Sequence, residues 1–329
     1  MSFSKGDSTM AAFFAIAIVS LLVDGTFGIC EKHLLSGKDE DAPLKIVVWF
    51  GIWNATSMIA FYAVGLSESG QPPWLILYHT PAILFSALCT VLYVLFYCLS
   101  IRRVKLTISE TILSMGPACT IIGMILIFLL SGKMAAAKSL LTPQKGIPLI
   151  VIFIAIGALA VVSKDTKKTV TETAAVDRSP QRKKYLLVGV AFAVICMLFD
   201  SIDSLLIFFS LTESQIGSYD FMIGYGFIDT LGGIFAFAYL YIKNKTVYNP
   251  FRKTEIPLSI CATGETIVDV LYIFAADMNA VAYGIMWAAY PVLPILMSRI
   301  FLKERCTWKQ YLCIFVVLAM SFFLSISQN

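Results

Sequence analysis

Six acidic residues of this 329-residue chain lie within about two helical turns of the centres of its long apolar stretches. Placing a charged side chain in lipid costs about 2.5–3.5 kcal/mol on insertion scales, so we expect these acids to face a protein interior or a wet cavity. Asp200 and Asp203 are three residues apart, and Glu265 and Asp269 are four apart, which puts each pair on one helix face. The acids predicted to bind a substrate are Asp24, Asp200, Asp203, Asp229, Glu265 and Asp269.

Basic residues that could neutralise these acids are scarce in the same stretches. Arg299 lies near the end of its apolar stretch and can extend to water, and His79 stands alone. An unpaired carboxylate does not stay charged in an apolar interior, so the acids must bind protons or a cation that arrives and leaves. We therefore expect a carrier of cations, a proton-coupled carrier, or both. For any single acid, the alternative is a structural hydrogen bond to Ser, Thr or Tyr.

Aromatic side chains inside the apolar stretches could belong to the same site, because the faces of Trp and Tyr rings attract ammonium groups. Six rings are candidates: Trp53, Tyr78, Tyr225, Tyr272, Trp287 and Tyr290. Trp287 and Tyr290 are three residues apart and lie just before a proline, where a kink can open a cavity. We include these two, with Trp53 and Tyr78, in the predicted substrate-binding set. Packing or a place in the interfacial aromatic belt is the alternative for each ring.

The composition is typical of a membrane protein. Hydrophobic residues make up 58% and charged residues 14% of the chain, and the mean hydropathy is +0.82; soluble domains are about half apolar and a quarter charged. A membrane helix needs about 20 mostly apolar residues, and ten stretches qualify. We predict an all-α integral membrane protein with a retained first span rather than a signal peptide. The predicted spans are residues 10–34, 44–65, 73–98, 107–131, 147–163, 185–210, 220–243, 256–277, 279–302 and 308–327.

Basic residues segregate between the two sets of connections that alternate along these spans. Twenty of the 25 Lys and Arg residues fall in the connections after the first, third, fifth, seventh and ninth spans or within the three span residues next to those connections. Positive charge marks cytoplasmic loops. The sequence therefore predicts a multi-pass protein of the cell membrane with both termini on the non-cytoplasmic side.

Matching residues recur at offsets of 174 to 179 positions and indicate an internal repeat. The matched pairs are Asp24 with Asp200, Gly51 with Gly226, Asn54 with Asp229, Ser86 with Glu265, and Pro117 with Pro291, and a Val-Leu-Tyr triplet occurs at 91–93 and at 270–272. Five spans per repeat reverse the orientation, so the two halves must be inverted, as in alternating-access carriers with a substrate site near the midplane. We predict two five-helix repeats, 1–163 and 185–329, joined by a cytoplasmic linker, 164–184.

The sequence PVLPILMSRIFLKERCTWKQ (291–310) carries a family resemblance. A Leu-Lys-Glu triplet ending at Glu304 closes the ninth predicted span, and Thr307 and Gln310 lead into the tenth. With five-plus-five spans and a proline in the fourth span of each half, the chain resembles the EamA-like branch of the drug/metabolite transporter superfamily. The first half lacks the Lys-Glu pair. The resemblance implies a carrier of small metabolites or drugs that uses no cofactor.

Enzyme motifs are absent from the sequence. It has no His-Glu-x-x-His, no Gly-x-Ser-x-Gly and only two histidines, so we expect neither an enzyme with catalytic residues nor a metal centre. The eight cysteines lack paired metal spacing and are predicted to be free.

We therefore predict a secondary transporter that moves a small organic cation by alternating access, with proton coupling open. A carrier of a neutral metabolite (a sugar, nucleoside or amino acid), in which the acids serve only for proton coupling, is the alternative. Expected partners are the small-molecule substrate, protons and the lipid bilayer, without nucleic acid, in a monomer or homodimer.

Overall fold

The computed structural model of this chain describes most of its length. The described residues are 5–37, 39–130, 132, 142–165, 180–212, 216–289, 292–304 and 306–326. Within these ranges the chain forms helices and no strand, so the predicted all-α class is confirmed.

The helices differ widely in length, and the longest hold the predicted acids. They are α1 (Lys5–Leu35), α2 (Ala42–Ala63), α3 (Pro73–His79), α4 (Pro81–Arg103), α5 (Leu106–Leu113), α6 (Gly116–Leu130), α8 (Pro143–Asp165), α9 (Pro180–Thr212), α10 (Ser218–Asn244), the 3-10 turn η2 (Lys253–Glu255), α11 (Ile256–Ala289), α12 (Val292–Phe301) and α13 (Trp308–Ile326).

Seven helical segments in the described part of the chain are long and apolar enough to cross a membrane. They are Phe13–Leu35, Ala42–Ala63, Pro81–Arg103, Leu106–Leu130, Tyr185–Ile207, Ser218–Asn244 and Lys253–Met278. Two shorter apolar segments, Gly146–Leu159 and Trp308–Met320, lie where two further spans were predicted. The chain is thus a multi-pass membrane protein, as its composition predicts.

The ends of the helices differ from the predicted bounds at three places. The predicted span 73–98 is two helices, because Thr80 leaves the helical conformation (φ −130°, ψ 73°) before Pro81, and a residue that precedes proline disfavours helix. The eighth predicted span does not end at 277, since α11 continues to Ala289 through residues that contain no Gly or Pro break near that point. Helices overlap both ends of the predicted linker 164–184, because α8 extends to Asp165 and α9 begins at Pro180; residues 166–179 lie outside the described ranges, and the linker stays a prediction.

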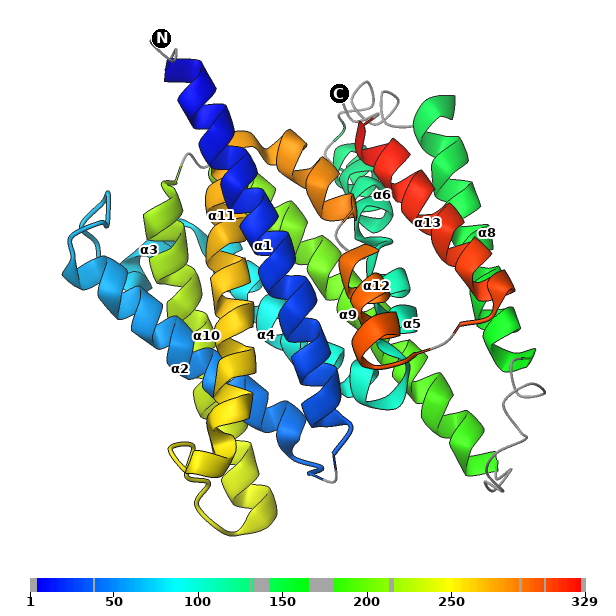
Figure 1. Ribbon diagram of the computed structural model, residues 1–329. Helices are drawn as coiled ribbons and strands as arrows, with labels where there is room; N and C mark the ends of the chain where they lie inside the picture. The colour runs from blue at the N-terminus through cyan, green and yellow to red at the C-terminus, as the bar shows by residue number, and fades with distance from the viewer. Residues whose placement is uncertain are drawn as a thin grey trace.

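The helices pack in pairs drawn from distant parts of the sequence (Figure 1). Helix α4 lies along α9, α1 lies along α11, and α2 packs against α10. At one side of the bundle α8 pairs with α13. The start of α1 and the end of α13 lie at the upper end in Figure 1, and the α1–α2 and α10–η2 connections lie at the opposite end. We call that opposite end the basic end.

Helices α2 and α10 touch backbone to backbone. A Cβ on Gly51 would lie 2.7 Å from the Cα of Gly233 and 2.9 Å from the carbonyl oxygen of Asp229. A Cβ on Gly226 would lie 3.0 Å from the carbonyl oxygen of Asn54. Small residues let membrane helices approach this closely, so the glycines at these positions are required by the packing.

Charged side chains fasten the helices at the basic end. The Asp41 carboxylate accepts hydrogen bonds from Lys243 Nζ at 2.5 Å and from Asn244 Nδ2 at 2.7 Å, and Lys45 Nζ lies 3.4 Å from Glu255 Oε1. Desolvation by itself would raise the pKa of Asp41, but the hydrogen bonds from Lys243 and Asn244 outweigh it, and the pKa is lowered. These contacts join α2 and the α1–α2 connection to the end of α10 and to η2.

Glu304 closes another contact between distant segments. Its Oε1 accepts the backbone N–H of Leu106 at 3.1 Å, and its Oε2 accepts the backbone N–H of Thr107 at 3.2 Å. These amides belong to the first turn of α5, where helical N–H groups have no partner within the helix. A residue that follows α12 therefore caps α5.

Candidate functional site

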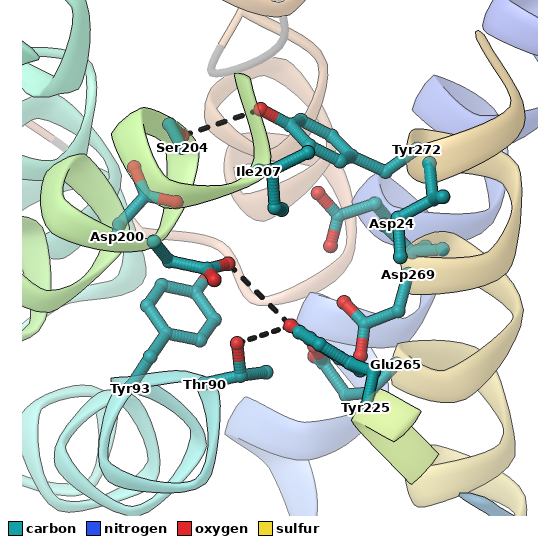
Figure 2. A pocket seen from close by; sticks show the side chains of 13 residues that line it. Asp24, Thr90, Tyr93, Asp200, Ser204, Ile207, Tyr225, Glu265, Asp269 and Tyr272 are labelled. Atoms are coloured by element: carbon teal, nitrogen blue, oxygen red, sulfur yellow. Dashed lines mark hydrogen bonds between the residues drawn. The ribbon is translucent and has the colours of Figure 1, made fainter. Parts of the chain in front are cut away.

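Five carboxylic side chains surround one internal cavity of about 40 Å³ (Figure 2). Asp24 comes from α1, Asp200 and Asp203 from α9, and Glu265 and Asp269 from α11. The other lining residues are Thr90, Tyr93, Ser204, Ile207, Tyr225, Val268, Tyr272 and Ile273. The structure thus brings together acids that are separated by up to 245 residues in the sequence.

Helical spacing explains how the acids reach the cavity. Asp200 and Asp203 lie almost one turn apart on α9, and Glu265 and Asp269 lie about one turn apart on α11, so each pair projects from one face. Asp24 reaches the same space from α1, which packs along α11. In Figure 2 the carboxylates of Asp24 and Asp200 enter from different sides of the space.

Hydroxyl groups hold one of the acids in place. The hydroxyl of Ser86 donates a short hydrogen bond to Asp203 Oδ1, and that of Tyr225 donates to Asp203 Oδ2 at 3.4 Å. The hydroxyls of Thr90 and Tyr225 share a further short hydrogen bond. A carboxylate with several hydroxyl donors keeps a fixed orientation without a basic partner.

Asp200 lies against the start of a helix. A Cβ on Gly116, the first residue of α6, would be 2.9 Å from Asp200 Oδ2. The absence of a side chain there lets the carboxylate approach the N-terminal end of α6, which carries partial positive charge. Next to it, the hydroxyl of Ser201 donates to the carbonyl oxygen of Gly116 at 3.2 Å.

No basic side chain in the described ranges forms an ion pair with the cavity acids. The ion pairs found there involve Lys45 and Lys243 at the basic end. In the cavity, Asp269 Oδ2 is buried without a hydrogen-bond partner. Asp229 is fully buried and its two carboxylate oxygens also have no partner, but it lies outside the cavity lining.

Of the four aromatic residues in the predicted substrate-binding set, the two whose side chains the structure describes, Trp53 and Tyr78, do not line this cavity. Tyr78 is 79% exposed on α3. Trp53 borders a separate apolar groove of about 270 Å³ between α2 and α11, and its Nε1 donates to the carbonyl oxygen of Ser259 at 3.1 Å. The side chain of Trp287 and the whole of Tyr290 lie outside the described part of the chain.

Three tyrosines border the cavity instead. Tyr225 and Tyr272 were among the six candidate rings, whereas Tyr93 was not selected as a site residue, although its Val-Leu-Tyr triplet was one sign of the predicted repeat. The hydroxyl of Tyr272 donates to Ser204 Oγ at 3.2 Å (Figure 2). The predicted repeat aligns Tyr93 with Tyr272, and this alignment could have indicated both rings.

The cavity chemistry is that of a small polar binding site. Its volume holds a few water molecules, since one water needs about 10–15 Å³, whereas pockets for organic ligands measure about 300–1,000 Å³. An organic ligand would therefore enter only after the helices around the cavity separate. Among the described residues no group of three or more His, Cys, Asp or Glu side chains is arranged to hold a metal ion.

Comparison with known proteins adds information about the fold. A solved crystal structure of a protein aligns with 96% of this chain and 97% of its own chain, with a TM-score of 0.52 and 13% identical residues. At that identity the likeness shows a shared fold and nothing about activity. No protein-family profile and no curated protein sequence matches this chain.

Proposed function

We propose that this protein is a secondary transporter that carries a small organic cation across the cell membrane by alternating access. The observation that supports this most strongly is the set of five carboxylic side chains around one cavity, of which Asp200, Asp203, Glu265 and Asp269 form no ion pair with a described basic residue. Such a site binds either protons or a cation that enters from outside. The tyrosine rings beside the acids suit an ammonium group.

A ten-span architecture of two inverted repeats is part of the proposal. Under the proposed repeat, α1 corresponds to α9, α4 to α11, and α6 to α12. Exchanging each helix for its counterpart turns the α4–α9 contact into α11–α1 and the α6–α9 contact into α12–α1. All four contacts occur. The α2–α10 and α8–α13 contacts are unchanged by the exchange, because α2 corresponds to α10 and α8 corresponds to α13. The packing pattern therefore has the symmetry expected for two related halves.

Close contacts at the α2–α10 crossing support the same repeat at the level of single residues. The repeat aligns Gly51 with Gly226 and Asn54 with Asp229. Gly51 packs against the carbonyl oxygen of Asp229, and Gly226 packs against that of Asn54. A two-fold axis between the two helices would relate each of these contacts to the other, because contacts across such an axis are reciprocal.

Membership of the drug/metabolite transporter superfamily, in its EamA-like branch, is likewise proposed. It rests on the five-plus-five arrangement, the motif around Glu304 and the buried acids. We further propose that the basic end faces the cytoplasm and that both chain termini are non-cytoplasmic. The start of α1 and the end of α13 lie together at the opposite end (Figure 1), and positive loops favour the cytoplasmic side.

In the proposed cycle, cations and protons compete for the same carboxylates. When the cavity opens to one side, a cation displaces protons from the acids, and the loaded site then opens to the other side. Because only the ionised acids attract the cation, its affinity falls as pH decreases. The hydroxyls of Thr90, Ser204 and Tyr272 could alternatively bind a neutral, hydroxyl-rich metabolite. The acids would then serve only as proton sites.

The test uses radiolabelled tetramethylammonium with full-length protein in vesicles. Wild-type protein should bind and exchange this cation more weakly as pH decreases, and Glu265→Gln should weaken binding and reduce the pH dependence. Glu255→Gln, at the basic end, removes a carboxylate outside the cavity and should behave as wild type. Absence of tetramethylammonium binding by the wild type at every pH contradicts the proposal. Tight binding of a neutral solute that survives Glu265→Gln supports the alternative.

A further inference from the structure

Glu31 is a buried carboxyl group outside the cavity lining, and the proposed function assigns it no role. It lies seven residues after Asp24 on the same face of α1, displaced toward the basic end. Its side chain is completely buried, and neither carboxylate oxygen has a hydrogen-bond donor within reach in the described structure. Such a group is costly unless it is neutral or paired.

The surroundings of Glu31 contain acids and thiols rather than bases. From α11 it faces Glu265 and Cys261, from α4 it faces Cys98, and from α5 it faces Glu110; Asp24 and Cys30 are its titratable neighbours on α1. Tyr97 of α4 donates to Glu110 Oε1 at 2.8 Å. None of these groups carries a positive charge that could pair with Glu31.

The adjacent lysine does not neutralise Glu31. Lys32 directs its Nζ to the carbonyl oxygen of Val104 at 2.7 Å and makes a short hydrogen bond to that of Ile101. These oxygens lie at the end of α4 and just beyond it, and the remaining charged group that acts on Lys32 is Glu304. The lysine ammonium is therefore committed to other partners.

Glu265 belongs to both environments. It lines the cavity and also faces Glu31. Two carboxyl groups can hydrogen-bond to each other only when one of them carries a proton. One O–H bond can then break on Glu265 as another forms on Glu31, with no net change in charge for the pair.

We propose that Glu31 is a second proton-binding site, which exchanges its proton with Glu265 and stores it between the cavity and the basic end. This inference rests on the proposed function, since Glu31 would receive the proton that a cation displaces from the cavity. Glu31 would not contact the cation. A proton held there can leave toward the basic end when the helices open on that side.

Infrared spectroscopy of the full-length protein in lipid tests this inference without a substrate, because protonated and ionised carboxyl groups absorb at different frequencies. The wild type should lose protons from the Glu31–Glu265 pair in two steps separated by more than about one pH unit, as interacting acids do. Glu31→Gln should remove one step and move the other. Glu31→Asp, which keeps a carboxyl, should retain both steps and serves as the rescue variant.

Three outcomes overturn the proposal. Glu31 could be ionised at all pH values, so that Glu31→Gln removes only a carboxylate signal. Glu31→Gln could remove an acid signal and leave the Glu265 step unmoved, as a purely structural acid would. The control Glu255→Gln could change the two steps as Glu31→Gln does.

Added tetramethylammonium chloride examines the proposed function separately in the same samples. The cation should change the Glu265 step if it binds in the cavity. Two coupled steps that do not respond to tetramethylammonium would contradict the cation proposal and leave the proton site standing. A response to tetramethylammonium together with a single, uncoupled Glu265 step would support the cation proposal and contradict the proton site at Glu31.

Discussion

The two halves of the chain contribute unequally to the cavity. The first half supplies Asp24, Thr90 and Tyr93, whereas the second half supplies the other four carboxyl groups and most of the remaining lining. The second half also carries the Lys-Glu motif that ends at Glu304. Under the proposed repeat, the two halves share their helix packing and differ in chemistry.

Single positions make the difference clearer. Under the proposed repeat, Asp24 corresponds to Asp200, and each half places one of these two acids at the cavity. By the offset of the Val-Leu-Tyr triplet, Thr90 corresponds to Asp269, and both line the cavity. In an inverted pair the architecture requires packing residues on both sides, whereas charge can be concentrated on one side. The comparison teaches that the acidic character of the site belongs mainly to the second half.

The largest effect is expected where the two halves must be alike. Gly51→Ala places a Cβ against α10 backbone atoms that cannot rotate away, so we expect a loss of about 1–3 kcal/mol of stability, as for overpacked cores. Gly226→Ala, at the corresponding contact, should also destabilise but less. Gly157→Ala on α8, where a Cβ meets nothing within 4 Å, is the control. Thermal unfolding of the purified proteins provides the measurement, and equal stability of Gly51→Ala and the control contradicts the reciprocal packing.

An intermediate effect is expected where the halves differ. Asp269→Thr gives the second half the residue type of the first, and we expect about tenfold weaker tetramethylammonium binding, equivalent to about 1.4 kcal/mol. Thr90→Ser keeps the hydroxyl that bonds to Tyr225 and should leave the affinity nearly unchanged. Equilibrium binding at a pH above neutrality compares the two. Equal losses would show that the halves contribute alike.

The smallest effect concerns the fastening of the halves at the basic end. The pKa of Asp41 is lowered in the folded protein, so its hydrogen bonds stabilise the fold above the unfolded value of about 3.9 and cease to do so as pH falls through the folded value. Asp41→Asn should cost about 0.2–1 kcal/mol at neutral pH, as exposed ion pairs do. Unfolding temperatures of variant and wild type should converge as pH falls below about 3.9 and through the lowered pKa of folded Asp41. A difference that persists in acid would mean that another interaction was lost.

The acids could be predicted from the sequence because a carboxyl group in an apolar stretch has a large energetic cost. Asp24, Asp200, Asp203, Glu265 and Asp269 were therefore predicted as site residues, and the structure places all five at one cavity. Whether they bind a substrate stays a prediction.

Aromatic and hydroxyl residues were harder to assign, because they are tolerated in lipid, at an interface or in a cavity. Tyr78 was predicted in the site and is exposed, whereas Tyr93 borders the cavity and was not selected. Helix ends had the same difficulty. The break at Thr80 follows from a local steric rule, whereas no Gly or Pro near residue 278 marks a helix end, and α11 continues to Ala289.

The cap that Glu304 places on α5 has a mechanical consequence. The first two amides of α5 depend on a carboxylate that follows α12, so the two helices can part at this point only if those amides find other acceptors. A helix movement that keeps these two hydrogen bonds would move the start of α5 and the end of α12 together as one rigid unit. Paired spin labels across this contact would then report a constant separation, while labels across neighbouring helix contacts at the basic end would report the amplitude of the proposed transport motion.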